Sequence, residues 1–221
     1  LEIRVEEGGW GTANAHDIEV LLYSVAEEMW TFFPNKELKS IIVVHSSEHP
    51  LVQYEKGPNG EYIVHLSAQD RRWSQYAYQF AHEFSHILSN YDHKDRRGQK
   101  RATDNQWFEE TLCETASLFT LKRMAETWRT EPPFPHWKDY APALSEYAEH
   151  FLNEAHRHLP PGVTLAQWYR DYREGLRDSP YLRQKNEVVA NLLLPLFEDN
   201  PEYWEAISYL NLDESEGFVF R

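Results

Sequence analysis

Apolar residues recur along the chain with two different periods, and the change of period marks where one kind of element gives way to another. Ser40–Ser46 is a short β-branched run that predicts a buried strand. Two further extended runs, Leu51–Lys56 and Glu61–Ser67, flank an Asn-Gly pair at Asn59 and predict a β-hairpin. Over Arg71–Asn90 the apolar residues recur at helical spacing, so this segment is predicted to be a helix with one apolar stripe.

Helical patterns also precede and follow this region. A polar, charged segment at Tyr91–Asn105 predicts a loop, and the proline cluster from Pro132 to Pro135 predicts a boundary between two lobes. We therefore expect an α+β fold with a small, mostly antiparallel sheet packed on the helix at Arg71–Asn90. The remaining predicted helices are Ala15–Phe33, Gln106–Thr127, Ala141–His158, Leu165–Arg177, Tyr181–Phe197 and Glu202–Leu210.

The predicted helix at Arg71–Asn90 contains the sequence His-Glu-Phe-Ser-His, from His82 to His86. Residues four apart lie one turn from each other on the same helix face, so the two imidazoles can bind one tetrahedral ion. Glu83 follows the first histidine directly and can act as a general base on a water held there. The face that carries both histidines is polar but uncharged, which is typical of a helix face that lines a cleft.

The predicted helix at Gln106–Thr127 supplies candidates for a third ligand. Glu110 and Glu114 fall side by side on its helical wheel, among apolar residues. Buried carboxylates are costly without partners, and a cation together with a ligating histidine would provide them. We assign Glu110 to the metal and Glu114 to the remaining N–H of a ligand imidazole. Glu109 is the fallback ligand.

This combination of motifs resembles the gluzincin superfamily, the thermolysin-like and aminopeptidase-like zinc metallopeptidases, over roughly residues 40–120. The resemblance implies a zincin-like catalytic lobe at residues 1–130, followed by a helical lobe at residues 131–221 that closes the cleft. By position, it implies zinc bound by His82, His86 and Glu110, with Glu83 as the base in peptide-bond hydrolysis and Glu114 as a brace. A peptide or protein is the implied substrate.

The same resemblance implies two less specific features. The strand at Glu61–Ser67 would form the upper edge of the cleft and pair with an extended substrate. A Tyr or His from the C-terminal lobe would donate a hydrogen bond to the oxyanion, and the candidates are Tyr140, Tyr147 and His150.

Other interpretations of the motif stay open. In a metzincin-like peptidase Asp92 would be the third ligand, although Ser89 stands where that class needs Gly. A catalytically silent zincin-fold module for binding or regulation is a second alternative, although a structural zinc site has no use for Glu83. Cys113, the single cysteine, is predicted to be a packed, inert thiol in the middle of a helix.

Composition excludes some partners. The 221 residues carry a formal net charge of −14, spread along the chain, which disfavours nucleic acid as a partner. No apolar run is long enough to span a membrane, and a single cysteine cannot form an intrachain disulfide. The chain begins with Leu1 rather than Met, which leaves the compartment open between the cytoplasm and secretion after leader removal. The oligomeric state is not predicted.

Overall fold

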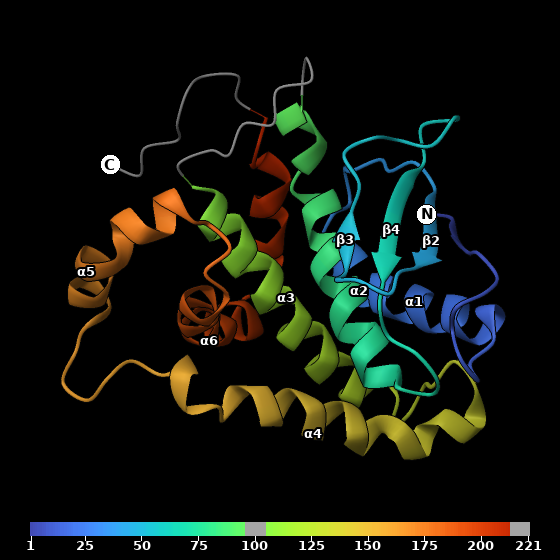
Figure 1. Ribbon diagram of the computed structural model, residues 1–221. Coiled ribbons are helices and arrows are strands. Elements are labelled where there is room, and N and C mark those ends of the chain that lie inside the picture. The colour runs from blue at the N-terminus through green and yellow to red at the C-terminus, as the bar shows by residue number, and fades with distance from the viewer. Residues whose placement is uncertain (96–104, 213–221) are drawn as a thin grey trace.

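The computed structural model describes residues 1–95 and 105–212, which form an α+β fold with far more helix than strand (Figure 1). In chain order its elements are β1 (Ile3–Val5), α1 (Ala15–Trp30), β2 (Ile41–His45), β3 (Leu51–Val52), β4 (Tyr62–Leu66), α2 (Trp73–Leu88), η1 (Tyr91–Asp95), α3 (Gln106–Thr127), η2 (Pro135–Tyr140), α4 (Ala141–Leu152), η3 (Ala155–Arg157), α5 (Leu165–Asp178), α6 (Arg183–Asp199) and η4 (Pro201–Tyr209), where η denotes a 3-10 helix. The helix predicted at Gln106–Thr127 is confirmed with the same bounds. Strand β1 was not predicted, because three residues are too short to show a period.

The sheet is mixed, and the prediction of a mostly antiparallel sheet is wrong. Its strands lie in the order β1-β2-β4-β3, and the pairs β1–β2 and β2–β4 are parallel. Strands β1 and β2 are joined through helix α1, and a crossover of this kind brings two strands side by side in the same direction. Only β3 and β4 are antiparallel, with Val52 opposite Val64.

The hairpin between β3 and β4 is confirmed, although both strands are shorter than predicted. The Gly57 N–H donates to the Glu61 carbonyl at 2.9 Å and closes the turn. Gly60 adopts a φ of 89°, a left-handed conformation that favours glycine. Strand β4 lies between β2 and β3, so the predicted edge strand Glu61–Ser67 is an interior strand. The edge belongs to β3, because the turn folds this short strand back along the outer side of β4.

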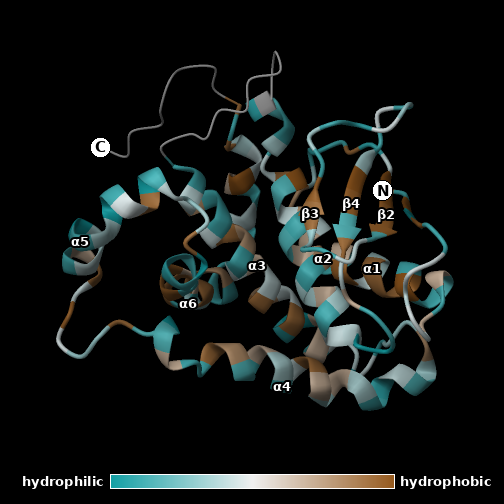
Figure 2. Ribbon diagram, viewed as in Figure 1, coloured by the Kyte–Doolittle hydropathy of each residue, from teal (hydrophilic) through white to brown (hydrophobic). Residues whose placement is uncertain are grey.

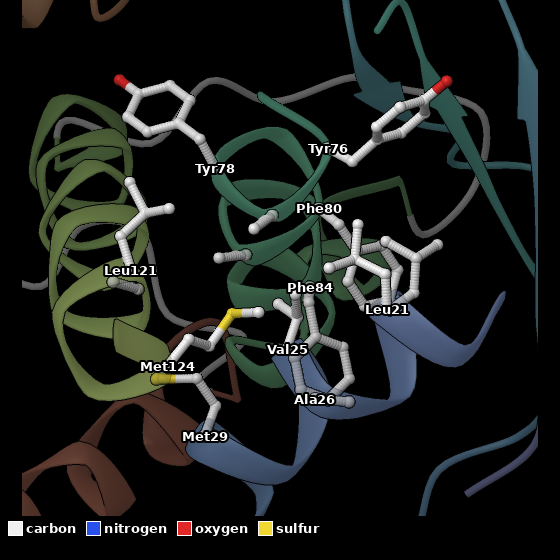
Figure 3. Close-up of a cluster of buried hydrophobic side chains, with 14 of the residues drawn as sticks. Leu21, Val25, Ala26, Met29, Tyr76, Tyr78, Phe80, Phe84, Leu121 and Met124 are labelled. Carbon is white, nitrogen blue, oxygen red and sulfur yellow. The ribbon is translucent and has the colours of Figure 1, made fainter. Parts of the chain in front are cut away.

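Helix α1 packs against α2 and β1 and closes one side of the core. It begins where predicted, because the Asn14 side chain caps it by accepting a hydrogen bond from the Asp17 backbone N–H at 2.7 Å. Apolar side chains from α1 meet those of α2 and α3 in one cluster (Figure 3). The labelled members from these helices include Leu21, Val25, Ala26, Met29, Phe80, Phe84, Leu121 and Met124.

Helix α2 is covered on nearly every side, with α1 and the sheet on one flank and α3 on the other (Figure 1). Its apolar stripe, which includes Phe80 and Phe84, faces α1 (Figure 3). Its polar face is buried as well, so that Glu83 and His86 are only 5% and 9% exposed. Buried polar groups need partners, and those of His86 come from α3 while Glu83 accepts a backbone hydrogen bond from Val52 in β3.

The C-terminal helices complete the molecule around α3. Helix α4 runs beneath α2 and α3, and α6 packs along α3 (Figure 1). One hydrophobic core extends from Ile3 to Ile207, so it includes residues from both predicted lobes. Helix α5 lies outermost and is largely hydrophilic (Figure 2). Among the described residues, none of the helices combines the length and the apolarity that a membrane crossing requires.

Candidate metal centre

The two histidines of α2 point toward one carboxylate of α3. The Nε2 atom of His82 lies 3.4 Å from Oε2 of Glu110, and Nε2 of His86 lies 3.6 Å from Oε1 of the same residue. Two ligand atoms bound to a tetrahedral zinc at its usual bond lengths are about 3.4 Å apart. Each Nε2 atom is therefore at about this separation from one oxygen of Glu110, with the two histidines facing different oxygens, and the chemical type of these donors suits zinc.

Glu110 is mostly buried, with its side chain 13% exposed, and has no permanently charged partner among the described residues. Burial alone raises the pKa of its carboxyl group, but the imidazoles of His86 and His82 lower the pKa by more, so the group stays ionised. Its other polar contact is the amide of Gln106, which donates to Oε1 at 3.0 Å. In the metal-free protein the two imidazoles therefore supply the counter-charge of Glu110, and a bound metal ion would take over that role.

Glu109 fixes the orientation of His86 from the opposite side of the ring. Its Oε1 lies 2.7 Å from Nδ1 of His86. An Nδ1–H that donates to this carboxylate leaves Nε2 as the acceptor that faces Glu110. Glu109 also accepts from Lys94 at 2.7 Å and from Asn211 at 2.9 Å. Burial opposes its ionisation, but the contacts with His86 and Lys94 lower its pKa to about 2.

The bracing contact predicted for Glu114 is thus made by Glu109, and Glu109 does not take the fallback role of a ligand. Glu114 lies one turn beyond Glu110 on α3, where it accepts a hydrogen bond from the Tyr78 hydroxyl at 2.7 Å and pairs with Arg157 at 2.8 Å. One helical turn separates Glu110 and Glu114 along the axis of α3. Glu114 therefore lies beyond the two histidines and contacts Arg157 from the C-terminal part of the chain.

Cys113 is a second candidate for the third ligand. A ligand atom from each of His82, His86 and Cys113 lies within 4.8 Å of the other two. The thiol is buried, and burial raises its pKa to about 12, so it is protonated without a metal. Because the thiolate is the form that binds metals, the ionised carboxylate of Glu110 is the better donor. Sequence analysis missed this proximity, because a lone cysteine in the middle of a helix was interpreted as a packed, inert thiol.

Glu83 lies beside the two histidines, between the cleft and strand β3. Burial raises the pKa of its carboxyl group, while His82 and His86 and a backbone hydrogen bond from Val52 oppose that shift. A carboxylate with a raised pKa is a stronger proton acceptor than an exposed glutamate. The geometry therefore gives Glu83 the properties that a general base needs.

His82 and Glu110 lie at the wall of a cleft of about 600 Å³, lined by residues of α2, α3, α4, α6 and the segments before β3 and α6. Its lining residues are His49, Pro50, Gln75, Tyr78, Gln79, His82, Glu83, Glu110, Glu114, Tyr147, Phe151, Tyr181, Arg183, Asn186 and Glu187. Tyr181 and Arg183 were not predicted to line the cleft, because no local pattern links the start of α6 to a motif about a hundred residues earlier.

The three candidates for the oxyanion donor differ in their position relative to the cleft. Tyr147 lines the cleft, whereas the Tyr140 hydroxyl is 3.2 Å from the Ser74 hydroxyl at the start of α2. His150 is exposed and does not line the cleft. Tyr181 lines the cleft. Burial raises the pKa of its phenol, and the nearby Glu110 carboxylate raises that pKa further.

Asp92, the third ligand in the metzincin-like alternative, is directed elsewhere. Its carboxylate pairs with Lys56 at 3.3 Å. It follows Asn90, whose φ of 59° turns the chain away from α2 and into η1. The described residues place Glu110, and not Asp92, opposite both histidines.

Comparisons with protein-family models, with curated proteins and with solved structures gave no match to this chain. We therefore infer function from the residues and their geometry. The strongest observation is the convergence of two imidazoles and one carboxylate from neighbouring helices.

Proposed function

We propose that this protein is a zinc-dependent peptidase of the gluzincin type, with zinc held by His82, His86 and Glu110. The observation that carries the proposal is the pair of distances, 3.4 and 3.6 Å, from one Glu110 carboxylate to the Nε2 atoms of both histidines. Three protein ligands leave a fourth position for water or substrate, as in catalytic rather than structural zinc sites.

The roles of the protein groups follow from their positions. When bound, zinc supplies Lewis acidity that polarises the scissile carbonyl and acidifies a water. Glu83 removes a proton from the attacking water and delivers it to the leaving amine. Glu109 holds His86 in the tautomer that leaves Nε2 as an acceptor. Tyr181 donates a hydrogen bond to the oxygen of the carbonyl under attack.

The surroundings of the site suit an extended peptide. His49 and Pro50 line the cleft directly before the edge strand β3. The backbone groups of an edge strand can pair with an added strand, which is a common way of holding peptide backbone. A peptide held along β3 would pass beside Glu83, whose carboxylate contacts Val52 of that strand.

A catalytically silent zinc module is the competing function, and the position of Cys113 is the observation that favours it. If Cys113 joined His82, His86 and Glu110, four protein ligands would surround the ion and leave no position for water. Such a protein would bind zinc and hydrolyse nothing.

The test combines elemental analysis with digestion of a mixed peptide library by the wild type and Glu83→Gln. We expect about one zinc per chain in both, and a loss of hydrolysis of about 10²–10⁴-fold in Glu83→Gln, the usual contribution of a positioned base. Glu126→Gln, an exposed glutamate of α3, is the matched control and keeps full activity. Zinc without hydrolysis in the wild type, together with zinc loss in Cys113→Ser, would establish the silent module instead.

A further inference from the structure

Arg183 is the permanent cation among the residues that line the cleft. It is the first residue of α6, and its side chain is 65% exposed although it is held in place at one edge. Its Nε donates to Oε1 of Glu187 at 2.8 Å, and its Nη2 donates to the hydroxyl of Tyr78 at 3.1 Å. The guanidinium is therefore oriented by two contacts while it faces the cleft.

A partly buried network supports these two contacts, and we call it the arginine cluster. Its members are Tyr78, Glu114, Glu154, His156, Arg157, Arg183 and Glu187. Arg157 is 1% exposed and bridges Glu114, at 2.8 Å, and Glu187, at 2.9 Å. Because Arg157 shares one positive charge between these carboxylates, Arg183 also pairs with Glu187, and the rest of its exposed guanidinium faces the cleft.

The remaining donors of Arg183 are suited to one kind of ligand. A guanidinium has five N–H groups, and the two contacts above use one on Nε and one on Nη2. Within the described part of the chain, Nη1 has no hydrogen-bond partner. Three N–H groups thus remain, two on Nη1 and one on Nη2, and a carboxylate with its two oxygens is a good match for several guanidinium donors.

We propose that Arg183 binds a carboxylate of the peptide substrate in the cleft, and so makes acidity near the cleaved bond a determinant of specificity. This inference rests on the proposed peptidase function. The carboxylate has two sources, the C-terminus of the peptide or the side chain of Asp or Glu. The first would make the enzyme a carboxypeptidase, and the second an endopeptidase with an acidic preference.

The experiment uses N-acetylated random octapeptide libraries prepared in matched forms. One pair has either a free C-terminal carboxylate or a C-terminal amide, and the other pair, amidated, contains either Glu and Asp or Gln and Asn. Hydrolysis by the zinc-loaded wild type is compared with that by Arg183→Met, Arg183→Lys and the control Arg177→Met, an exposed arginine of α5. Retention of the same libraries on zinc-loaded Glu83→Gln protein, with and without Arg183→Met, measures binding without hydrolysis.

We expect the wild type to favour the acidic member of one pair by about ten-fold or more, the value of one charge-assisted contact. Arg183→Met abolishes the preference, Arg183→Lys retains part of it because the charge remains, and Arg177→Met retains all of it. Which pair shows the preference identifies the source of the carboxylate. An equal preference in wild type and Arg183→Met overturns the proposal, as does no preference in either pair. If hydrolysis is absent altogether, the proposed function fails, and the retention ratios still decide whether Arg183 binds carboxylates.

Discussion

Two regions of the cleft hold histidines and glutamates at metal-ligand spacing, and they differ in how their charge is balanced. The histidine cluster comprises His82, His86, Glu109 and Glu110, and the other region is the arginine cluster. In the latter, Glu154, His156 and Glu187 also have ligand atoms within 4.8 Å of one another. There, however, Arg157 lies 3.0 Å from Glu154 and 2.9 Å from Glu187. The carboxylates of the arginine cluster are therefore already paired with a cation.

Among the described residues, the histidine cluster has no Arg or Lys paired with Glu110. Lys94 pairs with the neighbouring Glu109, while the ion-pair partners of Glu110 among the described residues are the two histidines. Ligand spacing alone is thus a weak criterion for a metal site, and the balance of charge separates the two regions. Glu110 and Glu114 show the same contrast one turn apart on α3, because the first meets imidazoles and the second meets Arg157.

The largest effect should come from removing Glu110 of the histidine cluster, and His156 of the arginine cluster provides the comparison. Glu110→Ala should lower zinc affinity by more than the roughly 10–100-fold that loss of an outer hydrogen-bond partner costs. His156→Ala should leave zinc content and affinity unchanged, because Arg157 makes that region unattractive to a second cation. Competition with a fluorescent chelator measures both affinities. Zinc lost in His156→Ala and kept in Glu110→Ala would reverse the assignment of the two regions.

Arg157→Met tests whether the arginine cluster is held together by its own cation. The substitution leaves Glu114 and Glu187 buried without their shared partner, and breaking a buried ion pair costs about 3–5 kcal/mol of unfolding free energy. Denaturant unfolding of the metal-free protein measures the change. Arg177→Met, on the surface, should stay within about 0.5 kcal/mol of the wild type. A similarly small change in Arg157→Met would mean that the network contributes little.

Glu109→Gln tests the outer contact of the histidine cluster. The amide keeps the size of the side chain but weakens its hold on the Nδ1–H of His86, so zinc affinity should fall by about 10–100-fold. Glu114→Gln serves as the comparison and should bind zinc like the wild type, because Glu114 contacts Tyr78 and Arg157. Equal losses in the two variants would restore Glu114 as the brace.

Tyr181→Phe should have the smallest effect. A preorganised oxyanion donor contributes about 10²–10³-fold to kcat, but Tyr181 is 66% exposed, so we expect about ten-fold. Zinc content and KM should change little. Tyr203→Phe, a 48% exposed tyrosine outside the cleft, is the control. A larger loss in Tyr147→Phe than in Tyr181→Phe would move the role to Tyr147.

The sequence by itself determined the features that depend on neighbours along the chain. The four-residue spacing places His82 and His86 on one face of α2, and Glu83 follows at a fixed angle, because helix geometry is local. The Asn-Gly turn and the cap at Asn14 are local in the same way.

Tertiary structure decided which of several similar residues meets which partner. Glu109, Glu110 and Glu114 are equally acidic in the sequence. Only the packing of α3 against its neighbours brings them to Nδ1 of His86, to the Nε2 atoms of both histidines and to Arg157, respectively. The direction of β2 beside β4 and the arrival of Tyr181 and Arg183 at the cleft depend on contacts across long stretches of chain. Residue order contains no periodic signal for such contacts, because they form only when whole elements pack.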